Sequence, residues 1–338
     1  MAARGPRFAA RLEDAVQGFR ERRGRRRGRI PTVVPFVGYG GPGWVRVLAR
    51  VVLRKPGDLS SDRLEGIRGW RSFLSVPVRD TEVVVESGGV RHAVRADRGG
   101  VIDARLEFDL EPGWREVRMS VDGDAVDARV LIVDPAVPFG LVSDIDDTVM
   151  VTALPRPLLA AWNTFVLDEH ARTPVAGMSV LYDRLQRSHP GAPVVYLSTG
   201  AWNVVPTLTR FLGRNLYPAG PLLLTDWGPT TDHWFRNGVA HKRDSLRRLS
   251  EEFPHIRWLL VGDDGQSDEH TYGEFAATHP DRVVAVAIRR LTPGQAVLAG
   301  GRSSGAATDA GVRWVYASDG AGLAAQLSDL GIVEAGPA

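Results

Sequence analysis

The chain has 338 residues, of which 43% are hydrophobic and 24% charged, and its formal net charge is +2. At about 150 residues per domain this length predicts two domains, and the composition excludes a wholly disordered chain and a coiled coil. The sequence has no cysteine, which excludes disulfides, thiolate metal sites and cysteine nucleophiles. It also lacks an apolar run of membrane-spanning length and a signal peptide, so we expect a cytoplasmic protein.

The positive charge is concentrated at the N-terminus. Residues 1–29 contain ten arginines and three acids, a net charge of +7, which leaves −5 for the rest of the chain. Apolar residues recur there at helical spacing, at Phe8, Leu12, Val16 and Phe19. This pattern predicts an amphipathic basic helix over residues 7–23, followed by an arginine-rich run. The helix either packs on its own protein or binds an anionic surface at the inner face of the membrane, as a peripheral protein does. Nucleic acid is disfavoured, because no aromatic or base-reading pattern accompanies the arginines.

Residues 30–136 show the two-residue period of β-strands. Runs rich in β-branched residues, such as 45–53, 81–86 and 128–133, are separated by glycine-rich turns. Short strands without a long helix between them predict a β-sandwich-like domain. No cluster of titratable residues stands out in this region, so we expect a packing or docking module.

Residues 137–330 alternate short apolar runs with helical patterns. The runs expected to form strands buried on both faces are 139–142, 194–197, 222–224, 258–261 and 283–288. The segments expected to form helices are 157–167, 177–188, 204–213, 241–253 and 270–278. This alternation predicts an α/β domain with a Rossmann-like parallel sheet, helices on both faces, and a site at the carboxyl ends of the strands.

The first of these strands runs into the acidic sequence Ser143-Asp144-Ile145-Asp146-Asp147-Thr148. Carboxylates at one strand end repel one another and raise one another's pKa unless a cation lies among them. The spacing of Asp144 and Asp146 places both carboxyls on the same side of an extended chain. An acid-rich turn is the alternative, but the pattern favours a functional site.

Two further strand ends carry polar groups. Ser198-Thr199-Gly200 follows the second strand and suits hydrogen bonding to a phosphoryl oxygen. The fourth strand ends in Gly262-Asp263-Asp264-Gly265-Gln266-Ser267-Asp268, which adds acids to the same edge of the sheet. Oxygen ligands without cysteine or clustered histidine indicate a hard cation, and Mg²⁺ fits best.

Lys242 is one of only two lysines among 42 basic residues, and it precedes the fourth strand. Its compact ammonium can neutralise a phosphoryl group where a planar guanidinium is too bulky. Asp226 also follows a strand, but for this residue a turn or a helix cap is the interpretation that we favour.

Together these motifs resemble a known family. Asp-x-Asp-x-Thr, Ser, Lys and Gly-Asp-x4-Asp, in this order, resemble the four motifs of haloacid dehalogenase superfamily phosphatases. The flanking residues resemble more narrowly the actin-patch phosphatidate phosphatase family, in Ser143 to Thr148, Tyr196-Leu197-Ser198, Ala201-Trp202-Asn203, Gly220 to Leu224, His241-Lys242 and Asp268 to Tyr272. The resemblance covers about residues 137–291, and the β-rich region is similar to the N-terminal part of bacterial members.

The chain departs from the family pattern at two places. Ser198-Thr199-Gly200-Ala201-Trp202 stands where the family usually has Ser-x-Ser-Pro-Trp. Gly262-Asp263-Asp264-Gly265 stands where it has Gly-Asp-Ser-Gly. Neither departure removes a catalytic group, so both bear on the substrate rather than on the chemistry.

The resemblance implies a role for each motif residue. Asp144 is the nucleophile that forms an aspartyl phosphate, and Asp146 is the general acid and then the general base. Ser198 and Lys242 hold the phosphoryl oxygens. The implied Mg²⁺ ligands are Asp144, Asp263 and the backbone carbonyl of Asp146. The implied substrate contacts are Thr148, Thr199 and Gly200, and the implied supporting acids are Asp264 and Asp268.

Spacing leaves no room for a large separate lid domain, either between Thr148 and Val194 or between Gly200 and Lys242. An open site suits a phosphate on a bulky carrier. We therefore expect an Mg²⁺-dependent phosphatidate phosphatase. The alternatives are the same chemistry on a phosphoprotein or a soluble phosphate ester, and a non-catalytic membrane-associated adaptor. The acid cluster argues against the adaptor, and the leaving-group acid Asp146 argues against a dehalogenase.

Overall fold

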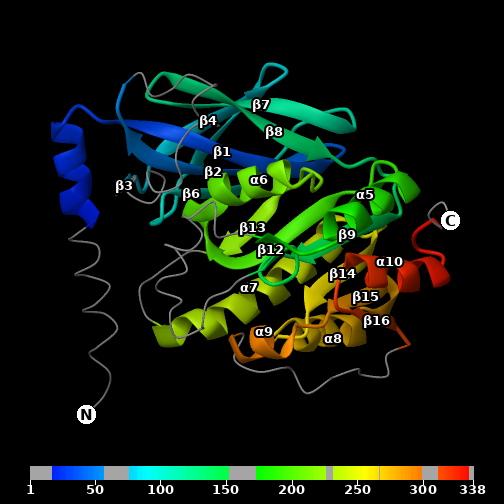
Figure 1. The fold of residues 1–338 in the computed structure, drawn as a ribbon. Coiled ribbons are helices and arrows are strands. Elements are labelled where there is room, and N and C mark those ends of the chain that lie inside the picture. Colours follow the sequence, from blue (N-terminus) through cyan, green and yellow to red (C-terminus); the bar gives the residue numbers. More distant parts are fainter. Residues whose placement is uncertain are drawn as a thin grey trace, which may run out of the picture.

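A computed structural model describes residues 17–56, 76–151, 173–225, 231–265, 267–298 and 311–334, with the side chains of 231–237 and 298 left aside. The expected helix at 157–167 lies outside these residues, as do Phe8, Leu12, Val16 and Asp226. A β-rich part lies against an α/β part, and the strands of the two parts form separate sheets (Figure 1).

The β-rich part is one curled sheet rather than the expected pair of sheets. In the described residues its eight strands are β1 (Ile30–Gly41), β2 (Trp44–Arg54), β3 (Val76–Pro77), β4 (Glu82–Ser87), β5 (Val90–Arg95), β6 (Val101–Leu106), β7 (Gly113–Val121) and β8 (Asp124–Ile132). Their order is β3-β2-β1-β8-β7-β4-β5, and β6 pairs with β2. The sheet is continuous because β1 pairs with β2 on one side and, in parallel, with β8 on the other. Alternate residues of its strands enclose an apolar core.

The α/β part confirms the predicted α/β class. Its parallel strands in the described residues are β9 (Phe139–Asp144), β12 (Val194–Ala201), β13 (Leu222–Thr225), β14 (Arg257–Asp263), β15 (Val283–Arg289) and β16 (Arg313–Ala317). Their order is β13-β12-β9-β14-β15-β16. Successive strands are added on one side of β9 up to β13 and on its other side from β14 onward, so the strand order reverses between β9 and β14. Such a switch point opens a crevice at the carboxyl ends of the two strands.

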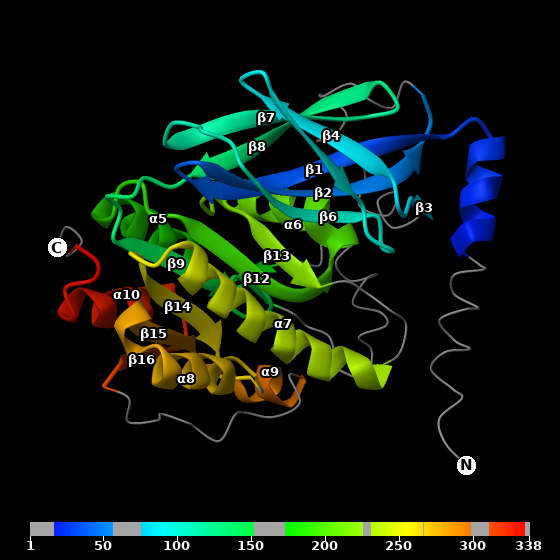
Figure 2. The same ribbon diagram turned by 180° about the vertical axis from the view of Figure 1, so that it is seen from behind.

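The helices cover both faces of this sheet. The elements are α5 (Met178–Ser188), α6 (Val205–Arg214), α7 (Thr231–Glu252), α8 (Asp268–Thr278), α9 (Pro293–Leu298) and α10 (Gly320–Asp329), with single turns η2 (Trp202–Val204) and η3 (Pro280–Arg282). Strand β10 (Met150–Val151) pairs antiparallel with β11 (Thr173–Pro174). Helices α5 and α10 pack together on one face, and α7 and α8 lie on the other (Figures 1 and 2).

Helix α7 begins at Thr231, well before the predicted start at residue 241. Residues 231–240 do not show the helical spacing of apolar residues from which the helix start was predicted. Gly238 lies in this part, and a Cβ atom there would come within 2.8 Å of the Thr199 side chain. The glycine therefore lets α7 approach the carboxyl end of β12.

The two parts share a buried interface. Phe36 of β1 stacks on Trp202 with ring centroids 5.5 Å apart. The hydroxyl of Tyr39 donates to Glu252 at the end of α7 (2.8 Å), and Arg46 of β2 forms an ion pair with the same carboxylate (2.6 Å). Phe36 and Tyr39 belong to the same apolar core as the parallel sheet. The β-rich part is therefore a fixed neighbour of α7.

Residues 17–26 are helical and pack on the β-rich part through their small residues. Gln17 donates to the carbonyl of Arg98 (3.2 Å), and Gly24 lies against Leu53. The arginines of this helix are exposed, and Phe19 is 58% exposed beside them. Among the helices in the described ranges, none has the length and apolar character needed to cross a membrane.

Candidate active site

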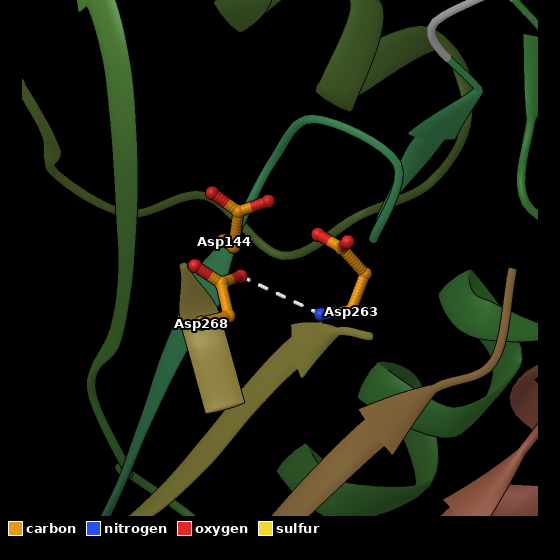
Figure 3. Close-up of side chains that lie close together, drawn as sticks. All are labelled: Asp144, Asp263 and Asp268. Atoms are coloured by element: carbon orange, nitrogen blue, oxygen red, sulfur yellow. Dashed lines mark hydrogen bonds between the residues drawn. The ribbon is translucent and has the colours of Figure 1, made fainter. Parts of the chain in front are cut away.

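The site lies at the switch point between β9 and β14. Strand β9 is buried along its whole length and delivers Asp144 to its carboxyl end, where the carboxylate is 3% exposed. Strand β14 delivers Asp263 beside it, and Asp268 follows at the first residue of α8. The three carboxylates face one another in Figure 3, and each offers an oxygen within 4.8 Å of the others.

Lys242 ties two of these acids together. Its Nζ lies 2.6 Å from Asp144 Oδ1 and 2.5 Å from Asp268 Oδ1, and all three side chains are buried. The ammonium comes from the middle of α7. His241, the residue before it, forms a hydrogen bond through Nε2 to the carbonyl of Leu223 on β13 (3.1 Å). This contact fixes the turn of the helix that carries Lys242.

Asp263 and Asp268 are held by backbone amides. The N–H of Asp263 donates to Asp268 Oδ2 (3.4 Å), as Figure 3 shows, and the N–H of Gly265 donates to Asp263 Oδ1 (2.6 Å). A Cβ atom at Gly262 would lie 2.6 Å from Asp268 Oδ2. Glycine at this position therefore allows the start of α8 to come against β14.

The buried carboxylates of the cluster repel one another when they are ionised, and a bound cation would relieve this repulsion. Burial raises the pKa of Asp144 well above its usual value, and Asp268, Asp146 and Asp263 add to this while Lys242 opposes it. Burial and Asp268 likewise raise the pKa of Asp263. Burial lowers the pKa of Lys242, but Asp144 and Asp268 outweigh burial, so the net shift is upward. The site contains more negative charge than Lys242 alone can balance.

The residues present fit a divalent cation. Asp144, Asp263 and Asp268 carry three negative charges when ionised, and Lys242 supplies one positive charge. The difference matches the charge of a divalent cation that takes oxygen ligands. Both oxygens of Asp268 already accept hydrogen bonds, from Lys242 and from the Asp263 amide. Asp144 and Asp263 are therefore the better ligands, and Asp268 fits the supporting role implied by the resemblance.

Asp146 lies two residues after Asp144, in the loop that follows β9. Its Oδ2 accepts a hydrogen bond from Ser198 Oγ (3.1 Å), and the same hydroxyl oxygen accepts one from the Gly200 amide (3.0 Å). Ser198 is buried, whereas Asp146 is half-buried. Strand β12 thus brings Ser198 next to Asp146, as expected for neighbouring strand ends of a parallel sheet.

The other predicted site residues have different surroundings. Thr148 is fully buried, and its hydroxyl has no hydrogen-bond partner in the described part of the chain. The carbonyls of Thr199 and Gly200 accept from the hydroxyl of Thr225 (3.0 and 3.1 Å), which joins β12 to β13. The Asp264 Oδ1 accepts from the amide of Leu291, two residues after the end of β15 (2.7 Å).

Arg289 is a buried cation that sequence reasoning missed. It ends β15 directly opposite Asp263 in the parallel register and is 5% exposed. Its guanidinium donates to the carbonyl of Asp147 (2.6 Å), to the carbonyl of Ser318 (3.3 Å) and to Gln295 Oε1 (2.9 Å). Its place at a strand end was visible in the sequence, but arginine is so common in this chain that it gave no signal.

The contact with Asp147 holds a strained turn. Asp147 has φ of +57°, a left-handed conformation that costs a non-glycine residue about 1 kcal/mol or more. Its N–H donates to the Met150 carbonyl (2.7 Å), and its own carbonyl receives the Arg289 hydrogen bond. The turn follows Asp146 directly, so Arg289 helps to set the direction of the Asp146 peptide.

Comparisons with known proteins find similarity in the α/β part. Residues 139–290 match the family model described as "Phosphatidate phosphatase APP1, catalytic domain". The phosphatidate phosphatase APP1 of Saccharomyces cerevisiae is 25% identical over 249 residues, which cover 69% of this chain and 40% of that protein. An uncharacterized protein of Schizosaccharomyces pombe is 27% identical over 151 residues, 44% of this chain and 24% of that protein. The chain thus spans less than half the length of these relatives.

The solved structures that align with this chain are only distantly similar to it. A carbohydrate acetylesterase from Xanthomonas citri aligns with 80% of this chain and 73% of its own at 12% identity, with a TM-score of 0.29. A β-glucuronidase from Bacteroides uniformis covers 78% of this chain and 36% of its own at 8% identity, with a TM-score of 0.20. Similarity at this level carries no argument about fold or function. The similarity to the APP1 catalytic domain rests instead on the motif-bearing region itself, residues 139–290.

Proposed function

We propose that the chain is an Mg²⁺-dependent phosphatase of the haloacid dehalogenase type that hydrolyses phosphatidate to diacylglycerol and phosphate. The observation that carries this proposal is the buried pairing of Lys242 with Asp144 and Asp268 beside Asp263 at the switch point of the sheet. The match of residues 139–290 to the APP1 catalytic domain supports the lipid substrate. A buried acid cluster with one ammonium is costly for a scaffold, which argues against an adaptor.

The residues suggest two chemical steps. A carboxylate oxygen of Asp144 attacks phosphorus, the bond from phosphorus to the lipid oxygen breaks, and Asp146 gives its proton to that oxygen. Asp146 then takes a proton from water, which attacks the aspartyl phosphate and frees Asp144 and phosphate. Lys242 lies next to Asp144 and is placed to neutralise the phosphoryl oxygens. Ser198 orients Asp146 through its hydrogen bond.

Asp144, Asp263 and the Asp146 carbonyl would hold Mg²⁺, which supplies charge neutralisation and orientation of the phosphoryl group. Because the cation relieves repulsion only in the folded state, we expect Mg²⁺ to stabilise the protein. At a hundred times the dissociation constant the gain is about 2.7 kcal/mol. For a chain of this size that raises the melting temperature by about 4 °C over a chelator control.

A pair of neighbouring acids makes a matched control for this prediction. Asp263→Asn should lose the Mg²⁺ stabilisation. Asp264→Asn should keep it, because Asp264 uses its side chain on the Leu291 amide instead. Equal melting temperatures with Mg²⁺ and with chelator in the parent protein would show that the acids share no cation.

Arg289 is proposed as a positioning residue for Asp146. Arg289→Met should lower kcat by about tenfold to a hundredfold with little change in KM, because a small displacement of a reacting group is enough for such a loss. Arg289→Lys should recover part of the rate. Arg257 is the control, since it makes a similar bond to the Val283 carbonyl (3.1 Å) at the opposite end of the sheet. If the Arg289→Met enzyme keeps the parent's kcat, Arg289 does not position Asp146.

The exposed arginines of the helix at 17–26 are proposed to draw the site onto anionic lipid. Each basic residue near such a surface contributes about 1 kcal/mol, and salt weakens the attraction. Replacing Arg20, Arg22, Arg23 and Arg26 by glutamine should reduce phosphatidate hydrolysis in anionic vesicles, most at low ionic strength. The rate with a soluble aryl phosphate should stay within twofold. Loss of both rates would mean that the helix serves the fold rather than the membrane.

The substrate is tested by direct comparison. Phosphate release should be measured from phosphatidate in mixed micelles, from a phosphoserine peptide and from an aryl phosphate at matched concentrations. We expect the highest kcat/KM with phosphatidate. A higher value with the peptide would favour a phosphoprotein substrate while keeping the chemistry, and no release from any of them would overturn the phosphatase proposal.

A further inference from the structure

Two buried tyrosines lie close to the segment that carries the proposed nucleophile and acid. Tyr182 of α5 is 0% exposed and Tyr217, which follows α6, is 5% exposed. Their rings meet edge to face, with centroids 5.5 Å apart and planes at 79°. Burial raises the pKa of both phenols, so each hydroxyl keeps its proton and can donate a hydrogen bond. Neither side chain takes part in the chemical steps proposed for Asp144 and Asp146.

Tyr182 reaches the nucleophile through Ser143. The Ser143 hydroxyl donates to the carbonyl of Asp144 (2.6 Å), and its Oγ lies 2.6 Å from the hydroxyl of Tyr182. Because a serine hydroxyl has a single hydrogen, Tyr182 must donate to Ser143. Side chains alternate along β9, so Ser143 faces α5 while Asp144 faces Lys242 of α7. Asp144 is therefore held from both faces of the sheet, its carboxylate by Lys242 and its carbonyl by the chain of two hydroxyls.

Tyr217 holds the other end of the loop of residues 145–149. Its hydroxyl donates to the carbonyl of Val149 (2.9 Å), which also accepts from the amide of Val175 (3.1 Å). Within the loop the amide of Val149 donates to the carbonyl of Ile145 (3.0 Å). Asp146 lies between these contacts, so the segment that carries it is anchored where it begins and where it ends.

The backbone before Tyr217 adopts an unfavourable conformation. Leu216 has φ of +61°, in the left-handed region that a leucine rarely adopts, and its side chain is 81% exposed. The next residue turns inward, where the ring of Tyr217 stacks on Phe211 (centroids 6.4 Å apart) and its amide donates to the carbonyl of Leu212 (2.9 Å). An exposed leucine makes no contact that could offset this strain. The compensating contacts are therefore those of Tyr217.

From these contacts we propose that Tyr182, acting through Ser143, and Tyr217 are positioning residues that anchor the two ends of the loop carrying Asp146. The edge-to-face contact of the rings joins the two anchors. The direction of this loop matters, because the Asp146 carboxyl is the proposed acid and its carbonyl a proposed cation ligand. That consequence rests on the proposed function, whereas the anchoring itself does not.

Hydrogen exchange of the full chain in chelator tests the anchoring directly. Tyr182→Phe and Tyr217→Phe keep the rings and remove only the hydroxyls. Each should speed amide exchange in residues 144–150 by about fivefold, the effect of one lost hydrogen bond on a local opening. Exchange in residues 257–263 of β14 should stay as in the parent. Equal acceleration in β14 would show that the tyrosines support the whole fold, and would overturn the proposal.

Tyr39→Phe is the matched control for these variants. Tyr39 is 1% exposed, and its hydroxyl donates to Glu252 at the end of α7 (2.8 Å), so the change again removes one buried hydroxyl. Exchange in residues 144–150 should match the parent. If the variant that combines both loop tyrosine changes exchanges there no faster than Tyr39→Phe, the tyrosines do not anchor the loop.

Double variants show which contacts belong together. Tyr182→Phe and Ser143→Ala break the same chain of hydrogen bonds, so their combination should exchange no faster than the faster single variant. Tyr182→Phe and Tyr217→Phe release opposite ends of the loop, so their accelerations should multiply to about 25-fold. Accelerations that multiply for Tyr182 and Ser143 would overturn the route through Ser143.

The consequence for the site is measured by binding and by kinetics. Isothermal titration with Mg²⁺ should show about fivefold weaker binding in the variant that combines Tyr182→Phe and Tyr217→Phe, because the implied ligands lie in or beside the anchored loop. Its kcat with phosphatidate should fall about tenfold, with KM within about twofold of the parent. Tyr39→Phe should match the parent in both measurements. Faster exchange with unchanged kcat and unchanged Mg²⁺ affinity would overturn the positioning role. A parent protein that releases no phosphate would overturn the proposed function instead, and the exchange rates would still decide whether the tyrosines anchor the loop.

Discussion

Asp144→Asn is expected to lower phosphatidate hydrolysis by at least about a thousandfold, because it removes the proposed nucleophile. The fold should persist. Asp144 is buried among other acids that raise its pKa, so the variant loses repulsion as well as the ion pair with Lys242. These effects oppose each other, and Lys242 keeps its contact with Asp268. We therefore expect a free energy of unfolding in chelator within about 1 kcal/mol of the parent.

Asp264→Asn is the control for this result. Asp264 is also a buried acid at the end of β14, but its side chain accepts from the Leu291 amide and asparagine keeps that acceptor. Its activity should stay within about fivefold of the parent. Circular dichroism and thermal melts of both variants would show whether the fold is intact. Hydrolysis by Asp144→Asn within tenfold of the parent would contradict the nucleophile assignment.

The parallel strands could be predicted because burial on both faces leaves continuous apolar runs. The prediction that Asp144 and Asp263 meet followed from this, since the carboxyl ends of neighbouring parallel strands lie at one edge. Strand β16 was missed because it is an edge strand whose residues are only partly buried. Helices α9 and α10 were also missed, since the last helix that was predicted ended at residue 278.

The remaining differences depend on contacts between distant residues. The curled single sheet arises from the pairing of β1 with β8, whose partners Gly38 and Val130 are far apart in the sequence. The direction of Asp264 depends on the Leu291 amide, and the role of Arg289 depends on the Asp147 carbonyl. Residue type and spacing carry no information on such contacts. Motifs thus predict which groups converge, but not which neighbours orient them.

Asp146→Asn is the prediction with the second largest effect, and it separates the two chemical steps. A general acid contributes about 10²- to 10⁴-fold when the leaving group is a poor one, as an alkoxide of diacylglycerol is. A nitrophenolate leaves without protonation, so Asp144 should still be phosphorylated by a nitrophenyl phosphate. The second step should slow, because asparagine cannot take the proton of the attacking water.

The variant should therefore show a burst of nitrophenol close to one equivalent per active site, followed by slow turnover. With phosphatidate it should show no burst of diacylglycerol. Rapid-mixing measurements on both substrates check this. Ser198→Ala is the companion variant, because it leaves the Asp146 carboxyl in place and removes the hydroxyl that donates to it (3.1 Å) and that is implied to contact the phosphoryl oxygens. Its two steps should slow together and less severely. Equal loss of the first step on both substrates in Asp146→Asn would mean that Asp146 does not protonate the leaving oxygen, and that the acid of this reaction must be sought elsewhere at the edge of the sheet.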